Sequence, residues 1–112
     1  MPLDKTSFGS LIASARKEQK LSQKELAEKI IKEDGQAITP QYLNDIEHDR
    51  RSPSSDHLVK QFAKMLKHEE VTVDLLTALA GVFREEDRKA VQKASADQVE
   101  NAFVAFRKAL KE

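Results

Sequence analysis

The sequence predicts an all-α protein, and three observations lead to this prediction. Residues that favour helices, namely Ala, Leu, Glu, Lys and Gln, dominate a chain of 112 residues with only three glycines and three prolines. Apolar residues recur at spacings of three and four, as they do along one face of a helix. No segment shows the alternation of apolar and polar residues that is typical of a strand. We therefore expect one small helical domain with a helical appendage.

Two helices are expected in the first third of the chain. The first begins near Thr6 or Ser7 and carries a stripe of apolar residues along one face. The second follows Ser22, which can form a capping box with Glu25 because each side chain satisfies a free amide of the new helix. The pair Asp34-Gly35 is expected to end this second helix.

A third and a fourth helix are expected between residues 39 and 67. Thr39 followed by Pro40 is a strong start signal, since Thr accepts from free amides and Pro loses no hydrogen bond at the first helical position. The third helix is short and ends at about His48. The loop DRRSPSS follows, and Ser54 or Ser55 then caps the fourth helix.

The last third of the chain is expected to hold two to three more helices. One covers residues 72–80 and ends at Gly81, and a charged helix begins at about Arg84. A last helix follows Ser95, which can form a capping box with Gln98. This helix gathers four apolar residues on one face at spacings of four, three and four, namely Val99, Phe103, Phe106 and Leu110.

The charge of the chain does not by itself indicate a nucleic-acid partner. Nineteen basic and nineteen acidic residues give a formal net charge of zero. Residues 1–68 hold 12 Lys and Arg against 10 Asp and Glu, whereas residues 69–112 hold 7 against 9. Because this asymmetry is small, a function must be sought in motifs rather than in overall charge.

Several classes of protein are excluded by what the sequence lacks. Without cysteine, disulfides and thiolate metal sites are impossible, and His48, His57 and His68 are spaced too widely for a helical zinc site. Neither a nucleophile elbow nor a phosphate-binding glycine loop occurs. We therefore expect no catalysis, no metal and no cofactor. Since no signal region and no run of roughly 20 apolar residues occurs, we expect a cytoplasmic protein without a membrane partner.

A functional signal lies in the helices expected at residues 22–32 and 40–48. Two short helices joined by a turn, the second with polar side chains at its start, commonly place side chains in the major groove of DNA. The stretches LIASARKEQKLSQKELA and ITPQYLNDIEHDRRSPSSDHLVKQFAKML supply this arrangement. Over residues 7–68 the sequence resembles the lambda-repressor and Cro type of helix-turn-helix regulators, the XRE family.

This resemblance implies which residues contact DNA. Leu43 and Ile46 must face the core, so the polar residues of the third helix remain for the groove. An amide side chain can both donate to and accept from an adenine edge. The expected base-reading residues are therefore Gln41 and Asn44, with Pro40 and Asp45 beside them. Contacts to the DNA backbone are expected from Gln23, Lys24, Thr39, Tyr42, Arg50 and Arg51.

The resemblance also implies a structural ion pair and shows two departures from the family pattern. Arg16 and Glu47 are expected to pair and to join the first helix to the end of the third helix, which is the recognition helix by this resemblance. The connection KEDGQAIT is a few residues longer than the usual turn of the family. Asp49 stands where a left-handed glycine usually ends the recognition helix.

The function that follows is a sequence-specific regulator, expected to be a dimeric repressor that binds a palindromic operator in double-stranded DNA. Residues 1–68 would form the DNA-binding domain, and residues 69–112 a helical extension for dimerisation or partner contact. The apolar stripe of the last helix could form core, a homodimer interface or a partner site. The alternative function is a protein-interaction module, such as a toxin-neutralising antitoxin, whose DNA binding is secondary.

Overall fold

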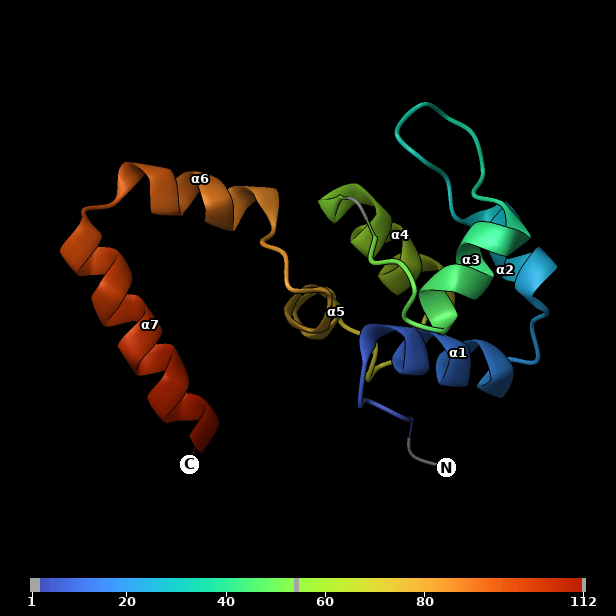
Figure 1. Cartoon of the computed structure of the whole chain (residues 1–112), viewed down its shortest axis with the longest axis horizontal. Coiled ribbons are helices and arrows are strands. Elements are labelled where there is room, and N and C mark those ends of the chain that lie inside the picture. Colours follow the sequence, from blue (N-terminus) through green and yellow to red (C-terminus); the bar gives the residue numbers. More distant parts are fainter. Residues whose placement is uncertain (1–2, 54, 112) are drawn as a thin grey trace. The chain divides into compact units, whose positions relative to one another are not determined.

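The computed structural model describes residues 3–53 and 55–111, and the expected all-α fold is confirmed. No β-strand occurs among these residues, although Ile31 and Ala37 form an isolated antiparallel bridge. The chain divides into two compact units, Met1–Val82 and Phe83–Glu112. The helices, labelled in Figure 1, are α1 (Phe8–Glu18), α2 (Gln23–Lys29), α3 (Pro40–Glu47), α4 (Asp56–Leu66), α5 (Val73–Ala80), α6 (Glu85–Lys93) and α7 (Ala96–Lys111).

The described part of the first unit has one hydrophobic core, to which α1 to α5 all contribute. Leu11 of α1, Leu26 of α2 and Leu43 of α3 are fully buried in it. Phe62 of α4 is also fully buried and packs edge-on against Phe8, with ring centroids 5.9 Å apart. Each large apolar side chain buried in this way stabilises the fold by about 1.5–3 kcal/mol. The core therefore holds the α2–α3 pair against α1 and α4.

Helix α5 belongs to the first unit rather than to the C-terminal extension. Leu76 is fully buried in the common core, and Val71, just before the helix, is nearly so. The first unit consequently continues past residue 68, where the sequence suggested a boundary, and ends at Val82. Gly81 ends α5 in a left-handed conformation with φ of 72°.

The expected helix starts are confirmed, because a hydroxyl group caps each of the first five helices. Ser7, Ser55 and Thr72 each accept a hydrogen bond from the backbone amide three residues on. Ser54, the other candidate cap of the fourth helix, lies outside the described residues. The capping box of Ser22 and Glu25 is complete, and its hydrogen bonds hold the pKa of Glu25 below the usual value.

The expectation that the second helix extends over 22–32 is wrong, because α2 already ends at Lys29. Ile30 adopts an extended conformation, and the amide of Ile38 donates to its carbonyl oxygen at 2.9 Å. Both isoleucines are buried in the core. The chain leaves the helix here because an extended pairing places both side chains inside, and a longer helix would not.

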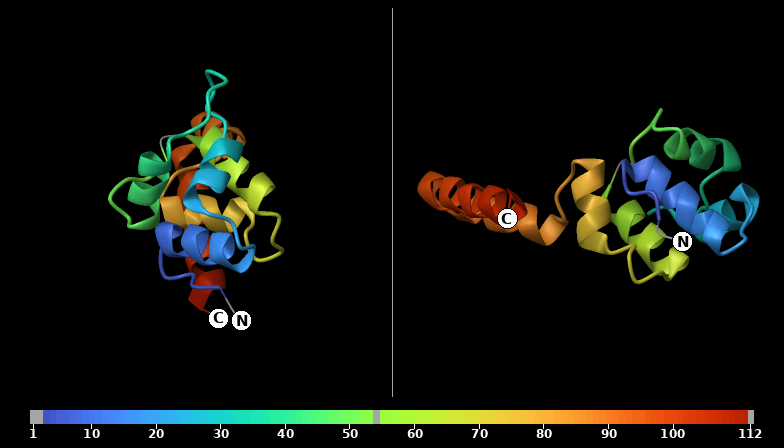
Figure 2. Two further views of the ribbon diagram at one scale, coloured as in Figure 1. Left: turned by 90° about the vertical axis from the view of Figure 1, so that its right-hand side faces the viewer. Right: turned by 90° about the horizontal axis from the view of Figure 1, so that it is seen from below.

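The connection between α2 and α3 is therefore a short hairpin, which extends away from the helices in Figure 1 and in the left view of Figure 2. Its tip turns at Gly35, where φ is 87° and the amide donates to the carbonyl oxygen of Lys32 at 2.9 Å. Its base is held by α4. The backbone of Ile31 contacts Gln61 Oε1 at 3.2 Å and His57 Nε2 at 2.8 Å. These contacts fix the path of the chain into α3.

The second unit contains α6 and α7, and none of its described residues is buried. Three rings cluster edge-on: Phe103 lies 6.1 Å from Phe83 and 6.3 Å from Phe106, measured between centroids. Ser95 and Gln98 exchange hydrogen bonds at the start of α7, as the expected capping box requires.

Candidate nucleic-acid interface

The first turn of α3 presents polar side chains because the opposite face of the helix is buried. Leu43 and Ile46 are fully inaccessible to solvent. The hydroxyl of Thr39 accepts from the amide of Tyr42 at 3.1 Å, and Pro40 occupies the first helical position. Thr39, Pro40 and Gln41 are consequently all exposed at the amino-terminal end of the helix.

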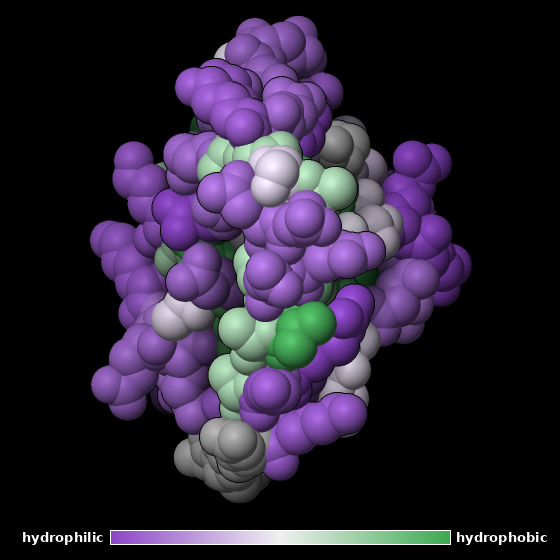
Figure 3. Space-filling model, turned by 90° about the vertical axis from the view of Figure 1, so that its left-hand side faces the viewer, coloured by the Kyte–Doolittle hydropathy of each residue, from purple (hydrophilic) through white to green (hydrophobic). Residues whose placement is uncertain are grey.

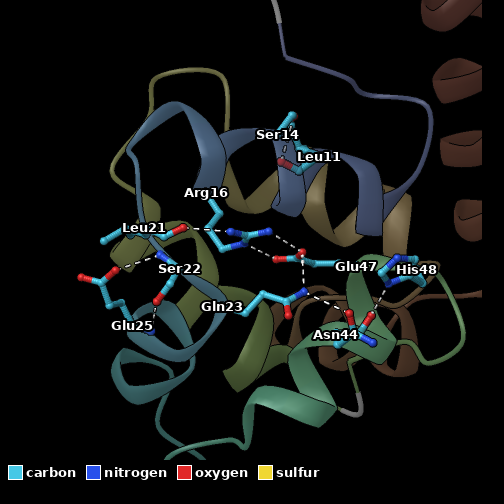
Figure 4. Close-up of polar contacts among 10 residues, drawn as sticks. All are labelled: Leu11, Ser14, Arg16, Leu21, Ser22, Gln23, Glu25, Asn44, Glu47 and His48. Carbon is cyan, nitrogen blue, oxygen red and sulfur yellow. Dashed lines mark hydrogen bonds and ion pairs between the residues drawn. The ribbon is translucent and has the colours of Figure 1, made fainter.

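A hydrogen-bond network fixes α3 against α1 and α2 (Figure 4). Arg16 Nε donates to Glu47 Oε2 at 2.6 Å, and a second guanidinium nitrogen donates to Oε1 at 2.9 Å. A third guanidinium nitrogen donates to the carbonyl oxygen of Leu21 at 2.8 Å. The side chains are only 11% and 3% exposed. The structure thus contains the ion pair that the family resemblance implied, in a buried and bidentate form.

Gln23 extends this network to the surface of α3. Its Nε2 group donates to Glu47 Oε1 at 3.0 Å and to Asn44 Oδ1 at 3.1 Å, as Figure 4 shows. Asn44 Oδ1 accepts this bond with one of its two lone pairs, and the amide nitrogen of Asn44 can donate to a ligand. Gln23 and Asn44, expected in different roles, are therefore coupled, and the Gln23 bond fixes the orientation in which Asn44 would meet a base.

Asp45 organises a second group of expected contact residues. Its Oδ1 atom accepts from Gln41 Nε2 at 3.1 Å and from Arg50 Nε at 3.2 Å. Its Oδ2 atom lies 3.6 Å from Arg51 Nε. The Asp45 side chain is 19% exposed, whereas the two arginine side chains are 56% and 62% exposed. The carboxylate therefore gathers Gln41 and two cations on one surface and is itself poorly placed to reach a base.

Tyr42 also contacts this arginine pair. The Arg51 guanidinium carbon lies 5.8 Å from the centre of the Tyr42 ring, which is a cation–π distance. Lys24, the remaining expected backbone contact, is exposed on α2. Most of the expected residues therefore form two sets on α2, α3 and the loop after α3. One set contains Gln23 and Asn44, and the other contains Gln41, Tyr42, Asp45, Arg50 and Arg51.

Sequence reasoning missed Gly9, which allows α1 to approach the end of α3 closely. A methyl group at this position would collide with the carbonyl oxygen of Ile46 and lie 2.7 Å from that of Glu47. Asp49 joins the same helices: it is left-handed, with φ of 58°, and accepts from Ser7 Oγ at 2.6 Å and from Gly9 N at 3.0 Å. No local pattern marks Gly9, because only packing makes it necessary.

The described residues were also compared with the requirements of a metal site, a pocket and a membrane span. Among residues 3–53 and 55–111, no group of three His, Asp or Glu side chains could hold a metal ion. A shallow hollow of about 260 Å³ lies beside the α2–α3 hairpin and is lined by Ile38, Tyr42 and Leu58. No helix in this part of the chain is both long and apolar enough to cross a membrane.

Comparison with known families agrees with this geometry. Residues 12–65 match the family model described as helix-turn-helix, a family of DNA-binding transcriptional regulators. This segment is a helix-turn-helix domain of the lambda-repressor and Cro type, also called the XRE family. The match begins within α1 and ends within α4. No curated protein and no solved structure matches the chain significantly.

Proposed function

We propose that the protein is a sequence-specific regulator that binds double-stranded DNA as a dimer and represses transcription in the cytoplasm. The observation that carries this proposal is the surface formed by α3 and the loop after it, where exposed Gln41, Arg50 and Arg51 all contact Asp45. A palindromic operator follows from a two-fold dimer, whose recognition helices would enter successive major grooves.

The residues of this surface divide into two roles. Gln41 reads a base, since its amide can form paired hydrogen bonds with adenine, and Asn44 donates to a neighbouring base edge. Arg50 and Arg51 bind phosphates, and Asp45 keeps both arginines on the same surface as Gln41 until they meet the DNA backbone. Thr39, Lys24 and the amino-terminal end of α2 at Gln23 add backbone contacts.

Selection from random duplexes tests the proposal directly. Purified protein is mixed with random double-stranded DNA at two salt concentrations, and the bound fraction is sequenced. We expect an enriched palindrome with half-sites about one helical turn apart. Binding without enrichment at both salt concentrations, or no binding, would contradict a sequence-specific regulator.

Substitutions separate the two roles on the selected operator. Gln41→Ala should reduce the preference for the operator over random DNA by about 1–3 kcal/mol, because one specific base contact is lost. Arg51→Ala should weaken binding to all sequences and flatten the salt dependence by about one unit, because one phosphate contact is lost. Fluorescence anisotropy over a salt series measures both effects.

A charge-matched control completes this comparison. Arg88→Ala removes the same charge from the exposed face of α6 in the second unit and should leave binding unchanged. Equal effects of Gln41→Ala and Arg51→Ala on specific and random DNA would contradict the two roles.

A second candidate function is a protein-interaction module, such as a toxin-neutralising antitoxin, in which DNA binding is secondary. The observation that favours it is the uncovered apolar surface of the second unit, where Phe83 and Phe106 are each about half exposed. Copurification of a stoichiometric second protein, lost when Phe103 and Phe106 are both changed to Ala, would support this function. Copurification that survives the double substitution would contradict it.

A further inference from the structure

Within the described part of the second unit, the apolar face of α7 is covered only where Phe103 packs against Phe83. Phe106 and Leu110 are 53% and 71% exposed, and Val99 and Phe103 are only half-buried. In Figure 3 this unit faces the viewer, and green apolar side chains are visible between purple hydrophilic ones. A shallow groove along the helix is lined by Val99, Phe103 and Arg107. Helices without a buried residue lack the packing that normally stabilises them, so this face requires a partner.

The spacing of the stripe fits a second copy of the same helix in the opposite direction. The steps of four, three and four residues between Val99, Phe103, Phe106 and Leu110 read the same from either end. These steps are also those of alternating core positions in a coiled coil. In an antiparallel pair, Val99 therefore lies level with Leu110 of the second copy, and Phe103 with Phe106.

The charges of α7 favour the same direction. Its amino-terminal half carries Asp97 and Glu100, whereas its carboxyl-terminal half carries Arg107, Lys108 and Lys111. A parallel pair would place like charges together, but an antiparallel pair places each acidic half against a basic half. Glu100 and Arg107 flank the stripe on one side, so each Glu100 faces Arg107 of the second copy. The helix dipoles also oppose each other in this arrangement.

The other side of the stripe is occupied by small residues. Ala102 and Ala109 flank it there, and both are exposed. In the antiparallel register Ala102 lies diagonally across from Ala109 of the second copy, two residues off level, so the helices can approach closely on this side. The apolar spacing, the charges and the small residues thus all specify one register.

We infer that α7 is the dimerisation helix and pairs antiparallel with α7 of a second copy about a two-fold axis between Val104 and Ala105. This inference deepens the dimeric regulator proposed above and names the surface and register of its partner. Val99, Phe103, Phe106 and Leu110 form the core of the interface, and two Glu100–Arg107 pairs border it.

Disulfide trapping tests the register, because the natural chain contains no cysteine. Ala102→Cys protein and a larger, tagged Ala109→Cys protein are refolded together and oxidised, without DNA. The mixed disulfide should exceed both homodisulfides several-fold on a non-reducing gel, because only unlike positions meet. The matched control combines Asn101→Cys protein with Lys108→Cys protein. These two positions are as far apart in sequence as residues 102 and 109, but they lie on the side of α7 away from the apolar stripe, so they should not cross-link.

Charge exchange tests the same pairing by a second measurement. Glu100→Arg and Arg107→Glu should each weaken self-association on the order of tenfold, since two attractive pairs become repulsive by symmetry. The double variant should restore the original dissociation constant to within about threefold in sedimentation equilibrium. A double variant no stronger than the single variants would overturn the inference.

Either homodisulfide as the main product, or a monomer at high concentration, would also overturn it. Because both experiments omit DNA, their failure is distinct from failure of the proposed function. If the protein forms a dimer in this register but selects no DNA sequence, the inference stands and the proposed regulatory function is wrong.

Discussion

Glu47→Ala is expected to lower the free energy of unfolding by about 3–5 kcal/mol, because it leaves the Arg16 guanidinium buried without its carboxylate partner. The two side chains are 11% and 3% exposed and share two hydrogen bonds. A small domain has a total free energy of unfolding of about 5–15 kcal/mol, so this substitution would remove a large part of the stability of the protein. Urea denaturation followed by circular dichroism measures the change.

Two control variants separate charge burial from general damage. Lys5→Ala removes one partner of an exposed pair with Glu70 and should change the stability by less than about 1 kcal/mol. Arg16→Met combined with Glu47→Leu removes both buried charges and should be more stable than Glu47→Ala alone. A double variant that is less stable than Glu47→Ala would show that the Arg16–Glu47 pair stabilises the fold more than apolar side chains do in its place.

Gly9→Ala is expected to destabilise the protein by about 1–3 kcal/mol through overpacking. Helix propensity alone predicts the opposite sign, since Ala is more favourable than Gly by about 1 kcal/mol within a helix. The added methyl group would collide with the carbonyl oxygen of Ile46 and lie 2.6 Å from Asp49 Oδ1. Helix α1 must then move away from the end of α3. Thermal and urea denaturation measure the effect.

An exposed position of the same helix supplies the matched control. At Lys17 of α1, the Ala variant should be more stable than the Gly variant by about 1 kcal/mol, as propensity requires. If Ala stabilises relative to Gly at residue 17 but destabilises at residue 9, the close contact between α1 and α3 is the cause. If Ala stabilises at both positions, the two helices can move apart without loss of stability.

The outcome of the sequence predictions differs between local and non-local features. The caps at Ser22, Thr39 and Ser55 are confirmed because a cap involves residues only three positions apart. The end of α2 was predicted wrongly. Ile30 continues the helical pattern, and nothing nearby in the sequence shows that it must pair with Ile38 in a hairpin.

The candidate site shows the same division. Gln41, Arg50 and Arg51 are all exposed, and the exposure of Gln41 follows from the burial of Leu43 and Ile46, which the helical spacing already indicates. The contact of Asp45 with Gln41 joins residues four positions apart on one helix, whereas its contacts with Arg50 and Arg51 depend on the path of the loop after α3. The link from Gln23 to Asn44 likewise depends on how α2 packs beside α3.

The sequence by itself determined the all-α class, the helix starts and the exposed residues of the recognition helix, because periodicity and capping act over a few residues. Only the tertiary structure decided where α2 ends, why Gly9 is needed and how Gln23 restrains Asn44. Those features join residues 8 to 40 positions apart, and such contacts are set by the packing of the whole core.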